Sequence, residues 1–256
     1  MPPSPLHPIS AQAPPLAGRA LLAQRWEHLF FVHWRVDPDL VAPLLPPGTR
    51  PDVVDGASWV GLIPFRLTRA RVGPSPALPW VGSFAETNVR LYAVDDSGRR
   101  GVVFASLEAE RLAFVLGARL VLGLPYTWAR MTIRTDGDRW EFESRRRWPG
   151  PGHPRTRLVL RTTPEPVVDD PTTTFLTARW GLHTSHLGRT LWLPNEHEPW
   201  ALRRAELLEL DDELVAAAGL PGLTERAPDS VLYSPGVSTR FGLAGPGTSG
   251  PPASTA

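Results

Sequence analysis

The chain has 256 residues, of which 42% are hydrophobic and 21% charged, and its formal net charge is +1. This is the composition of a globular protein with a sizeable core, and a charge so close to zero argues against a nucleic-acid partner. All 27 basic residues are arginine, and cysteine is absent. Schiff-base lysines, disulfides and thiolate metal sites are therefore excluded.

The two ends of the chain differ in composition from its middle. Residues 1–20 contain six prolines, and residues 243–256 are rich in Gly, Pro, Ser and Thr. Both segments are expected to be disordered tails around a single domain of residues 21–242. No stretch of 18 apolar residues would span a membrane, and the N-terminus lacks the charge and the apolar run of a signal peptide. We therefore expect a cytoplasmic protein without membrane partners.

The first predicted elements are short. The 30 prolines and 22 glycines cut the chain into brief pieces, which favours a mainly β fold with a few short helices, a β-rich α+β protein. Asp37 and Pro38 offer an N-cap and a first helical residue, and the prolines of 43–47 end this helix. Strands are predicted over 52–55 and 59–71, on either side of the turn Asp55-Gly56.

A hairpin is predicted next, and its polar residues form a pattern. Residues 84–94 alternate, 95–98 turn the chain, and 101–107 return as a partner strand. Period two places four polar side chains on one face, namely Glu86, Asn88, Arg90 and Tyr92. Alternation alone favours the solvated outside of a sheet. A barrel interior would instead bring an acid, an amide, a guanidinium and a phenol into one cavity.

The rest of the chain continues as strands and short helices. A helix is predicted over 108–122, because its apolar residues have helical spacing and the turn Gly123-Leu124-Pro125 follows. A second hairpin, further strands and two short helices complete the prediction: strands at 127–135, 139–148, 156–163, 191–193, 200–210 and 230–241, and helices at 172–180 and 211–218.

Two sequence motifs are rejected as cofactor or metal sites. The segment 245–250 matches the G-x-G-x-x-G pattern but lies in the C-terminal tail, without the strand and the helix that a dinucleotide site needs. The spacing of His183 and His186, and the run Glu196-His197-Glu198, match no metal-ligand pattern. No metal and no cofactor is therefore expected.

A series of motifs in a fixed order gives the chain a family resemblance. They are Phe84-x-Glu86-x-Asn88-x-Arg90-x-Tyr92, Gly101-Val102-x-Phe104-x-Ser106-Leu107, Ala118-Arg119-x-x-x-Gly123-Leu124-Pro125-Tyr126, His33-Trp34, Phe175-Leu176-Thr177-x-Arg179 and His197-x-Pro199-Trp200. Over about residues 25–242 the chain resembles the YqjF-like family, a bacterial group with a domain of unknown function. That family is similar to acetoacetate decarboxylase. The resemblance implies a large closed or nearly closed β-barrel with its site inside.

The resemblance also implies roles for individual residues. Glu86 falls near a site glutamate, Arg119 at the family arginine, and Tyr126 where the decarboxylases keep their Schiff-base lysine. Since no lysine is present to form an iminium, decarboxylase activity is not expected. Glu86 and Tyr126 are the candidate catalytic residues, for proton transfer. The candidate substrate-binding residues are Arg119, Arg90, Asn88, Ser106, Phe104 and Tyr92, with His33, Trp34, Arg179 and His197 as further candidates.

Three functions remain open on this reasoning. The leading hypothesis is a pocket for a small organic acid or carbonyl compound, with lysine-independent enolisation, dehydration or lyase chemistry as an option. The alternatives are a non-catalytic metabolite binder and a structural or interaction protein, and a homo-oligomer is compatible with each. Two details are also open. Burial and a nearby arginine shift the pKa of Glu86 in opposite directions, and Tyr126 either contacts a ligand or bonds a backbone carbonyl.

Overall fold

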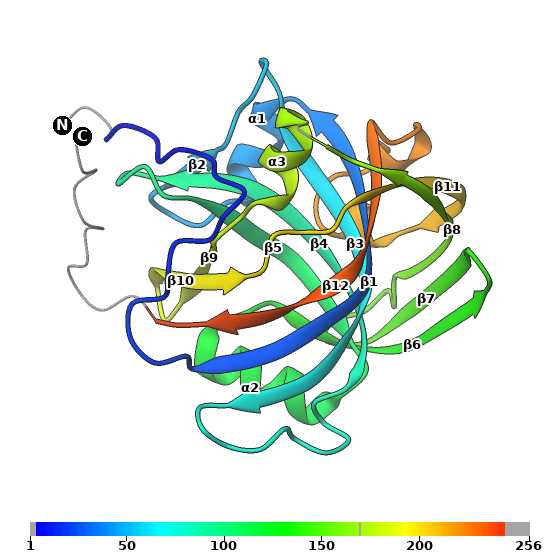
Figure 1. Cartoon of the computed structure of the whole chain (residues 1–256), viewed down its shortest axis with the longest axis horizontal. Coiled ribbons are helices and arrows are strands. Elements are labelled where there is room, and N and C mark those ends of the chain that lie inside the picture. Colours follow the sequence, from blue (N-terminus) through cyan, green and yellow to red (C-terminus); the bar gives the residue numbers. More distant parts are fainter. Residues whose placement is uncertain (1–3, 169, 244–256) are drawn as a thin grey trace.

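The computed structural model describes residues 4–168 and 170–243 (Figure 1). Strands form most of the fold, and the helices are short. In chain order the elements are β1 (Leu22–Val36), α1 (Pro38–Val41), the 3-10 helix η1 (Ala42–Leu44), β2 (Thr49–Pro51), β3 (Ser58–Val72), β4 (Phe84–Asp95), β5 (Arg100–Ala109), α2 (Leu112–Leu122), β6 (Tyr126–Asp136), β7 (Arg139–Trp148), β8 (Arg155–Pro166), α3 (Pro171–Thr177), β9 (Gly181–His186), β10 (Arg189–His197), β11 (Arg203–Asp212), α4 (Leu214–Ala217), the 3-10 helix η2 (Leu223–Glu225) and β12 (Ser230–Phe241).

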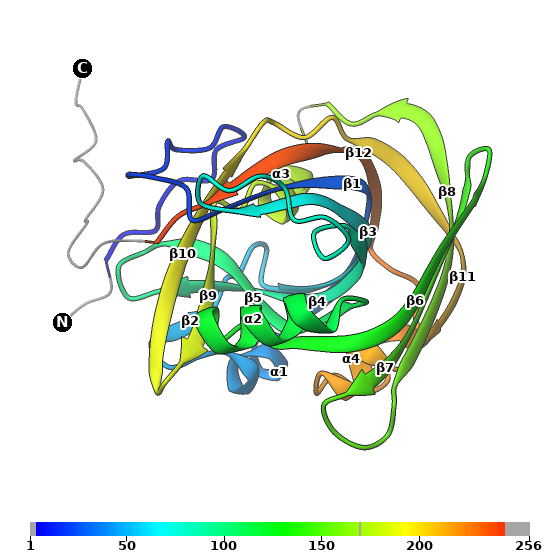
Figure 2. The ribbon, with the colours of Figure 1, turned by 90° about the horizontal axis from the view of Figure 1, so that it is seen from below.

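The twelve strands of the described chain form one sheet that closes on itself twice. One ring runs through nine strands, in the order β5-β6-β7-β8-β11-β12-β1-β3-β4, and closes by the pairing of β4 with β5. A second ring uses the pairings of β5 with β9 and of β10 with β12, and so contains seven strands. Figure 2 shows β6, β7, β8 and β11 on one side of the molecule and β9 and β10 on the other. The predicted β-rich fold with a closed sheet is confirmed.

The five strands common to both rings, β12, β1, β3, β4 and β5, form a wall with a core on each face. On one face Phe31, Ile63 and Tyr92 pack with residues of β9, β10, α2 and α3; we call this space the site compartment. On the other face Phe30 and Leu62 pack with residues of β7, β8 and α4; we call this the core compartment. Both faces of the wall are therefore buried.

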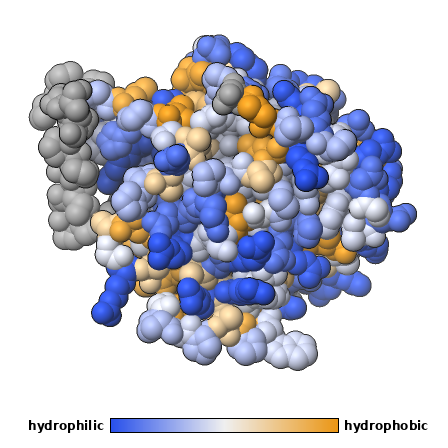
Figure 3. Space-filling view, viewed as in Figure 1, coloured by the Kyte–Doolittle hydropathy of each residue, from blue (hydrophilic) through white to orange (hydrophobic). Residues whose placement is uncertain are grey.

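β4 shows this double burial directly. Every residue of β4 is buried except Arg90, which is half-buried. The solvated-face interpretation of Glu86, Asn88, Arg90 and Tyr92 is therefore wrong, because their strand lies in the middle of the wall. Hydrophilic residues dominate the outer surface instead, as Figure 3 shows for one side of the molecule.

β-bulges decide which side chains of the wall face the site compartment. His28 has a left-handed backbone with φ of 54°, and the register of β1 against β3 shifts by one residue between Glu27 and Val32. Gln24 and Trp26 before the bulge therefore face the same side as Leu29 and Phe31 after it. Without this extra residue, period two would turn Gln24 and Trp26 to the other compartment.

Several predicted boundaries need correction. The helix predicted over 108–122 begins at Leu112, because Glu108 and Ala109 extend β5 and pair with both β4 and β6. Residues 52–55 form no strand, only an isolated bridge between Val54 and Ala57, and the short strand β2 precedes them. The strand β9 was not predicted, because the sequence of 181–186 lacks apolar alternation. The helix predicted over 172–180 is shorter, spans Pro171–Thr177 and is capped by the Asp170 side chain.

Residues 4–20 contain no helix or strand but lie against the domain. Backbone N–H groups of Ser4 and His7 donate to the carbonyls of Asp96 and Gly98, and the indole of Trp180 donates to the Ser10 carbonyl. The segment 244–256, which carries the glycine-rich motif and most of the predicted C-terminal tail, is outside the described residues, as are residues 1–3. The limits of the predicted domain and tails stay a prediction. No helix in the described ranges is long and apolar enough to cross a membrane.

Candidate functional site

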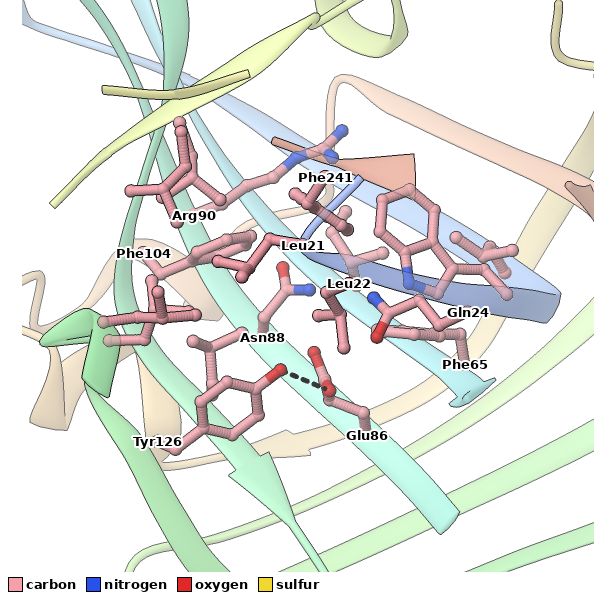
Figure 4. A pocket seen from close by; sticks show the side chains of 18 of the residues that line it. Leu21, Leu22, Gln24, Phe65, Glu86, Asn88, Arg90, Phe104, Tyr126 and Phe241 are labelled. Carbon is pink, nitrogen blue, oxygen red and sulfur yellow. Dashed lines mark hydrogen bonds between the residues drawn. The ribbon is translucent and has the colours of Figure 1, made fainter. Parts of the chain in front are cut away.

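A cavity of about 80 Å³ lies in the site compartment. A buried water needs about 10–15 Å³, so this space suits a molecule of a few heavy atoms. The polar residues in its wall are Gln24, Glu86, Asn88, Arg90 and Tyr126 (Figure 4). The rest of the wall is apolar apart from the indole N–H groups: Leu21, Leu22, Trp26, Leu29, Phe31, Ile63, Phe65, Phe104, Leu107, Leu122, Leu124, Leu182, Leu193, Trp200, Phe241 and Gly242.

Glu86 and Tyr126 form a hydrogen-bonded pair in this wall. The Tyr126 hydroxyl donates to Oε2 of Glu86 at 3.1 Å, and both side chains are buried. Glu86 is the third residue of the hairpin strand β4, and Tyr126 is the first residue of β6. The structure thus brings the two predicted catalytic candidates together. The hydroxyl of Tyr126 bonds a carboxyl group, not the backbone carbonyl of the structural alternative.

The turn before Tyr126 has a defined geometry. Gly123 ends α2 with a left-handed φ of 66°, and a Cβ there would lie 2.7 Å from the carbonyl oxygen of Ser185. Only glycine fits this position. The Arg119 guanidinium donates to the carbonyl of Tyr126 at 2.7 Å and so holds the start of β6. Local sequence therefore sets the entry of Tyr126 into the site.

Burial raises the pKa of Glu86 to about 8, and hydrogen bonds from Tyr126 and Asn88 offset only part of this rise. The carboxyl group is therefore mostly uncharged at pH 7. Burial, together with the neighbouring Glu86, raises the pKa of Tyr126 well above its usual value. The sequence left open whether the pKa of Glu86 is raised or lowered, and burial raises it. Glu86 and Tyr126 therefore each hold their proton, and the pair carries no net charge.

Arg90 is the cation of the cavity wall. Its Nε donates to the Tyr92 hydroxyl and its Nη2 to the carbonyl of Leu176, both at 2.9 Å, and its guanidinium lies 5.2 Å from the Phe31 ring centroid. None of these partners is an anion. Figure 4 shows Arg90 at one end of a row and Glu86 at the other, with Asn88 between them. The cavity therefore has a cationic end and an end with two neutral proton donors.

Three further polar atoms of the cavity residues lack hydrogen-bond partners within the described chain. They are Oε1 of Gln24, Nε1 of Trp26 and Oδ1 of Asn88, and each is buried. Buried polar atoms in native proteins are nearly always satisfied, so such atoms in a cavity wall indicate a ligand or bound water. Gln24 and Trp26 were not among the predicted site residues, because the bulge at His28 has no clear sequence signal.

A larger hollow adjoins the cavity on one side. It has a volume of about 410 Å³ and is lined by residues of 44–47, 123–125 and 183–185, together with Val103 and Phe104. Phe104 and Leu124 line both spaces. These two side chains therefore separate the cavity from the hollow, and Phe104, predicted to bind substrate, is half-buried between them.

Tyr92, His33 and Arg179 form a buried network behind Arg90 and do not line the cavity. The Tyr92 hydroxyl lies 2.6 Å from Nε2 of His33 and donates to the carbonyl of Leu176 at 2.9 Å. Burial lowers the pKa of His33 well below its usual value, and the charges of Arg90 and Arg179 lower it further. Arg179 pairs with Asp52 at 2.5 Å. These three residues were predicted to contact the ligand. In the structure their network instead positions the Arg90 side chain.

Arg119 and Ser106 were predicted to bind substrate, and the structure places both away from the cavity. The Arg119 guanidinium does not line the cavity and lies 5.1 Å from the centroid of the Trp148 ring. Ser106 is turned away by a bulge in β5. Val89 pairs with Ser106 and Arg90 with Phe104, so the face of Phe104 continues at Leu107.

Trp34 and His197 also lie outside the cavity wall. Trp34 faces the core compartment, and its indole donates to the carbonyl of Arg226. His197 packs 4.5 Å from the ring of Trp200, which does line the cavity, and its Nδ1 lies 2.6 Å from the carbonyl of Glu198. In the part of the chain that is described, no three histidine or carboxylate side chains cluster as metal ligands would; that no metal or cofactor is needed stays a prediction.

The fold is that of the acetoacetate decarboxylase-like proteins. Acetoacetate decarboxylase from Legionella pneumophila superposes with a TM-score of 0.59 over 91% of this chain and 92% of its own, at 15% identity. The enduracididine biosynthesis enzyme MppR in complex with pyruvate gives 0.54 over 86% of each chain, at 17% identity. At such low identity these structures show the fold alone.

Residues 23–238 match DUF2071, a family described as an uncharacterized conserved protein. The curated protein YqjF of Bacillus subtilis is 32% identical over 216 residues, which are 84% of this chain and 88% of YqjF. The chain belongs to the DUF2071 family. The family resemblance inferred from the motifs is confirmed, including its relation to the decarboxylase fold.

Proposed function

We propose that the cavity binds a small organic acid or carbonyl compound and that Glu86 and Tyr126 exchange protons with it. One observation carries the proposal. Among the described residues, Glu86 is buried with no cationic partner and accepts a hydrogen bond from Tyr126, and it shares a small cavity with Arg90, which has no anionic partner there. A buried acid kept neutral beside an accessible cation is an arrangement suited to polarising a substrate that carries negative charge.

The two ends of the cavity suggest a division of roles. Arg90 would bind a carboxylate, since guanidinium and carboxylate form strong charge-assisted hydrogen bonds. Glu86 and Tyr126 would donate hydrogen bonds to the carbonyl oxygen at the other end of the ligand. As the proton on the carbon beside the carbonyl leaves, one oxygen of the Glu86 carboxyl group accepts it while the other gives its own proton to the carbonyl oxygen, so the keto form becomes the enol and Glu86 stays neutral. The hydrogen bond from Tyr126 strengthens as negative charge develops on that oxygen. Enolisation, dehydration and lyase reactions of keto or hydroxy acids share this step.

Relatives of the same fold support this ligand class. MppR structures are described with pyruvate and with the condensation product of pyruvate and imidazole 4-carboxaldehyde. Both are compounds with a carboxylate or carbonyl group that would fit an arginine opposite two proton donors. Decarboxylation through an iminium is excluded for this chain, since Tyr126 cannot form an imine and no lysine is present.

A non-catalytic metabolite binder is the second candidate. The same cavity and the same polar ends would retain an acid without turning it over. The small volume favours tight enclosure of one compact ligand, which suits sensing or sequestration as well as catalysis. Turnover alone separates the two candidates.

Pyruvate in deuterated buffer is the probe that tests the proposal. Calorimetry measures its binding, and proton NMR follows exchange of its methyl protons, which reports enolisation. We expect Arg90→Met to weaken binding about tenfold or more, and Glu86→Gln to abolish exchange with a smaller effect on affinity. Arg134→Met, an arginine on the surface whose side chain is 60% exposed, is the matched control and should change neither.

Each result of this experiment decides between the candidates. Binding that depends on Arg90 together with exchange that depends on Glu86 supports the enzyme. Binding without exchange supports the metabolite binder. If wild-type protein fails to bind pyruvate and other keto and hydroxy acids of similar size, the proposed ligand class is wrong.

A further inference from the structure

α2 exposes an apolar face to solvent although it belongs to a closed domain. Leu112, Leu116, Leu120 and Val121 are 39%, 48%, 80% and 66% exposed. The opposite face of α2 is already used, since Val115 is buried and Leu122 lines the cavity. Figure 2 looks onto α2, which lies in front of β4 and β5. The helix is therefore apolar on both sides, whereas a surface helix is normally polar on the side that faces water.

Two strained residues extend this apolar face. Trp80 and Leu187 are 86% and 88% exposed, and each has a left-handed backbone, with φ of 63° and 49°. Trp80 lies near the start of α2, because Arg111 donates to its carbonyl at 2.9 Å. Leu187 lies near the end of α2, because the neighbouring His186 side chain contacts Gly123. A bulky apolar residue held outward at a positive φ is costly, and such strain concentrates at functional surfaces.

We propose that this face, formed by α2 with Trp80, Trp148 and Leu187, pairs with the same face of a second copy of the chain. The interface would have two-fold symmetry, with the two α2 helices antiparallel. Gly117 is the central residue of α2, exposed, with nothing within 4 Å of the position of a Cβ. Ala113, one turn earlier, is also exposed. These small residues beside the ridge of Leu112, Leu116 and Leu120 let two helices approach closely.

The size and the charge of the face fit a second copy. Its seven large apolar residues expose on the order of 800 Å² together, which matches the ~800 Å² that each partner buries in a standard dimer. Monomeric proteins rarely expose more than about 300–600 Å² in one apolar patch. The two arginines of the face, Arg111 and Arg119, already donate to carbonyls of their own chain. The face therefore offers little to a partner that binds through charge.

The proposed contact also supports the site. The inner face of α2 and the turn that follows it supply Leu122, Leu124 and Tyr126 to the cavity wall. A helix clamped against a symmetry-related copy would hold this part of the wall in place. The dimer does not depend on the proposed function, since no ligand contact enters its argument.

Analytical ultracentrifugation of the full chain tests the dimer. The wild-type protein should sediment as a species of twice the 28.1 kDa chain mass at tens of micromolar. Leu120→Glu places a charge in the centre of the contact, and Gly117→Gln blocks the close approach of the helices while favouring the helix itself. Each should raise the dimer dissociation constant by about thirtyfold or more. Leu40→Glu, an exposed leucine of α1 outside the face, is the control and should leave it unchanged.

An unchanged circular dichroism spectrum and a cooperative thermal transition would show that both variants fold. A wild-type protein that stays monomeric at these concentrations overturns the proposal. So does a dimer that persists in both variants, because it must then use another face. A monomer that binds phosphatidylglycerol vesicles through Leu120 would assign the face to a lipid surface instead, and would overturn the dimer as well.

Discussion

Two buried glutamates on the wall between the compartments differ in how their charge is handled. Glu108 faces away from the cavity and is fully buried, but Nη2 of Arg146 lies 2.5 Å from its Oε1. Glu86 is as deeply buried in the site compartment, where its hydrogen-bond donors are the neutral side chains of Tyr126 and Asn88. A buried carboxylate is normally paired with a cation. On the proposed function, the glutamate without a cationic partner marks the compartment in which the chemistry takes place.

The same contrast runs along β4. Its residues toward the core compartment include Val89, Leu91 and Ala93, which pack in the apolar core. Its residues toward the site compartment are Glu86, Asn88 and Arg90, which line the cavity. One strand thus packs the apolar core with one face and lines the proposed ligand site with the other. Substitutions on the core face should therefore change mainly the stability of the protein, and substitutions on the cavity face should change mainly ligand binding.

Breaking the ion pair between Glu108 and Arg146 should have the largest effect on stability. Arg146→Met removes the cation and leaves Glu108 buried and unpaired, which costs about 3–5 kcal/mol. Glu86→Gln keeps the shape of a side chain that is already neutral and removes the cost of taking up its proton on folding, so at pH 6 the variant should not be destabilised and should be more stable than wild type by about 2 kcal/mol. Urea unfolding of both variants and wild type measures the difference. Equal destabilisation by the two substitutions would remove the distinction between the glutamates.

The second largest effect should be the change in the free energy of unfolding with pH that the titration of Glu86 causes. Its folded pKa is about 8 and its unfolded value near 4.5, so between these pH values the folded state holds a proton that the unfolded state has lost. The stability from this proton is fully present below about pH 4.5 and is lost as the pH rises to about 8. Wild type should therefore lose roughly 2–3 kcal/mol between pH 5 and pH 7 relative to Glu86→Gln.

Urea unfolding of both proteins at several pH values measures this difference. The Glu86→Gln variant is its own control, because every other titrating group is retained. Parallel pH profiles for the two proteins would show that Glu86 is ionised in the folded state, and the contrast with Glu108 would then be lost.

The sequence predicted the parts of this site that local chemistry determines. The hairpin of β4 and β5 follows from its turn residues, and period two correctly grouped Glu86, Asn88 and Arg90. The helix end at Gly123 and the entry of Tyr126 also follow from local residues. Each of these predictions depends on a few neighbouring positions.

The remaining parts depend on bulges and on packing between distant segments. The bulges at His28 and in β5 reverse which residues face the cavity, so Gln24 and Trp26 were missed, and Ser106, a predicted site residue, does not line the cavity. Glu108 was assigned to a helix because its apolar neighbours have helical spacing, while pairing with β6 makes it a strand residue. A bulge in a long strand has no strong local signal, and burial on both faces hides the usual alternation.

The smallest expected effect concerns the hydroxyl of Tyr126. Tyr126→Phe removes one hydrogen bond to Glu86 and little volume, so the free energy of unfolding should fall by only about 1 kcal/mol. That hydrogen bond lowers the pKa of Glu86, whereas burial raises it. Without the hydroxyl the pKa of Glu86 should therefore move further up, above about 8. NMR titration of the ¹³C-labelled Glu86 carboxyl group measures this shift, with Tyr233→Phe as the control, since Tyr233 bonds His28 in the core compartment. A pKa that stays the same or falls in Tyr126→Phe would show that the hydroxyl does not stabilise the charged form of Glu86, and Tyr126 would then be only a wall of the cavity.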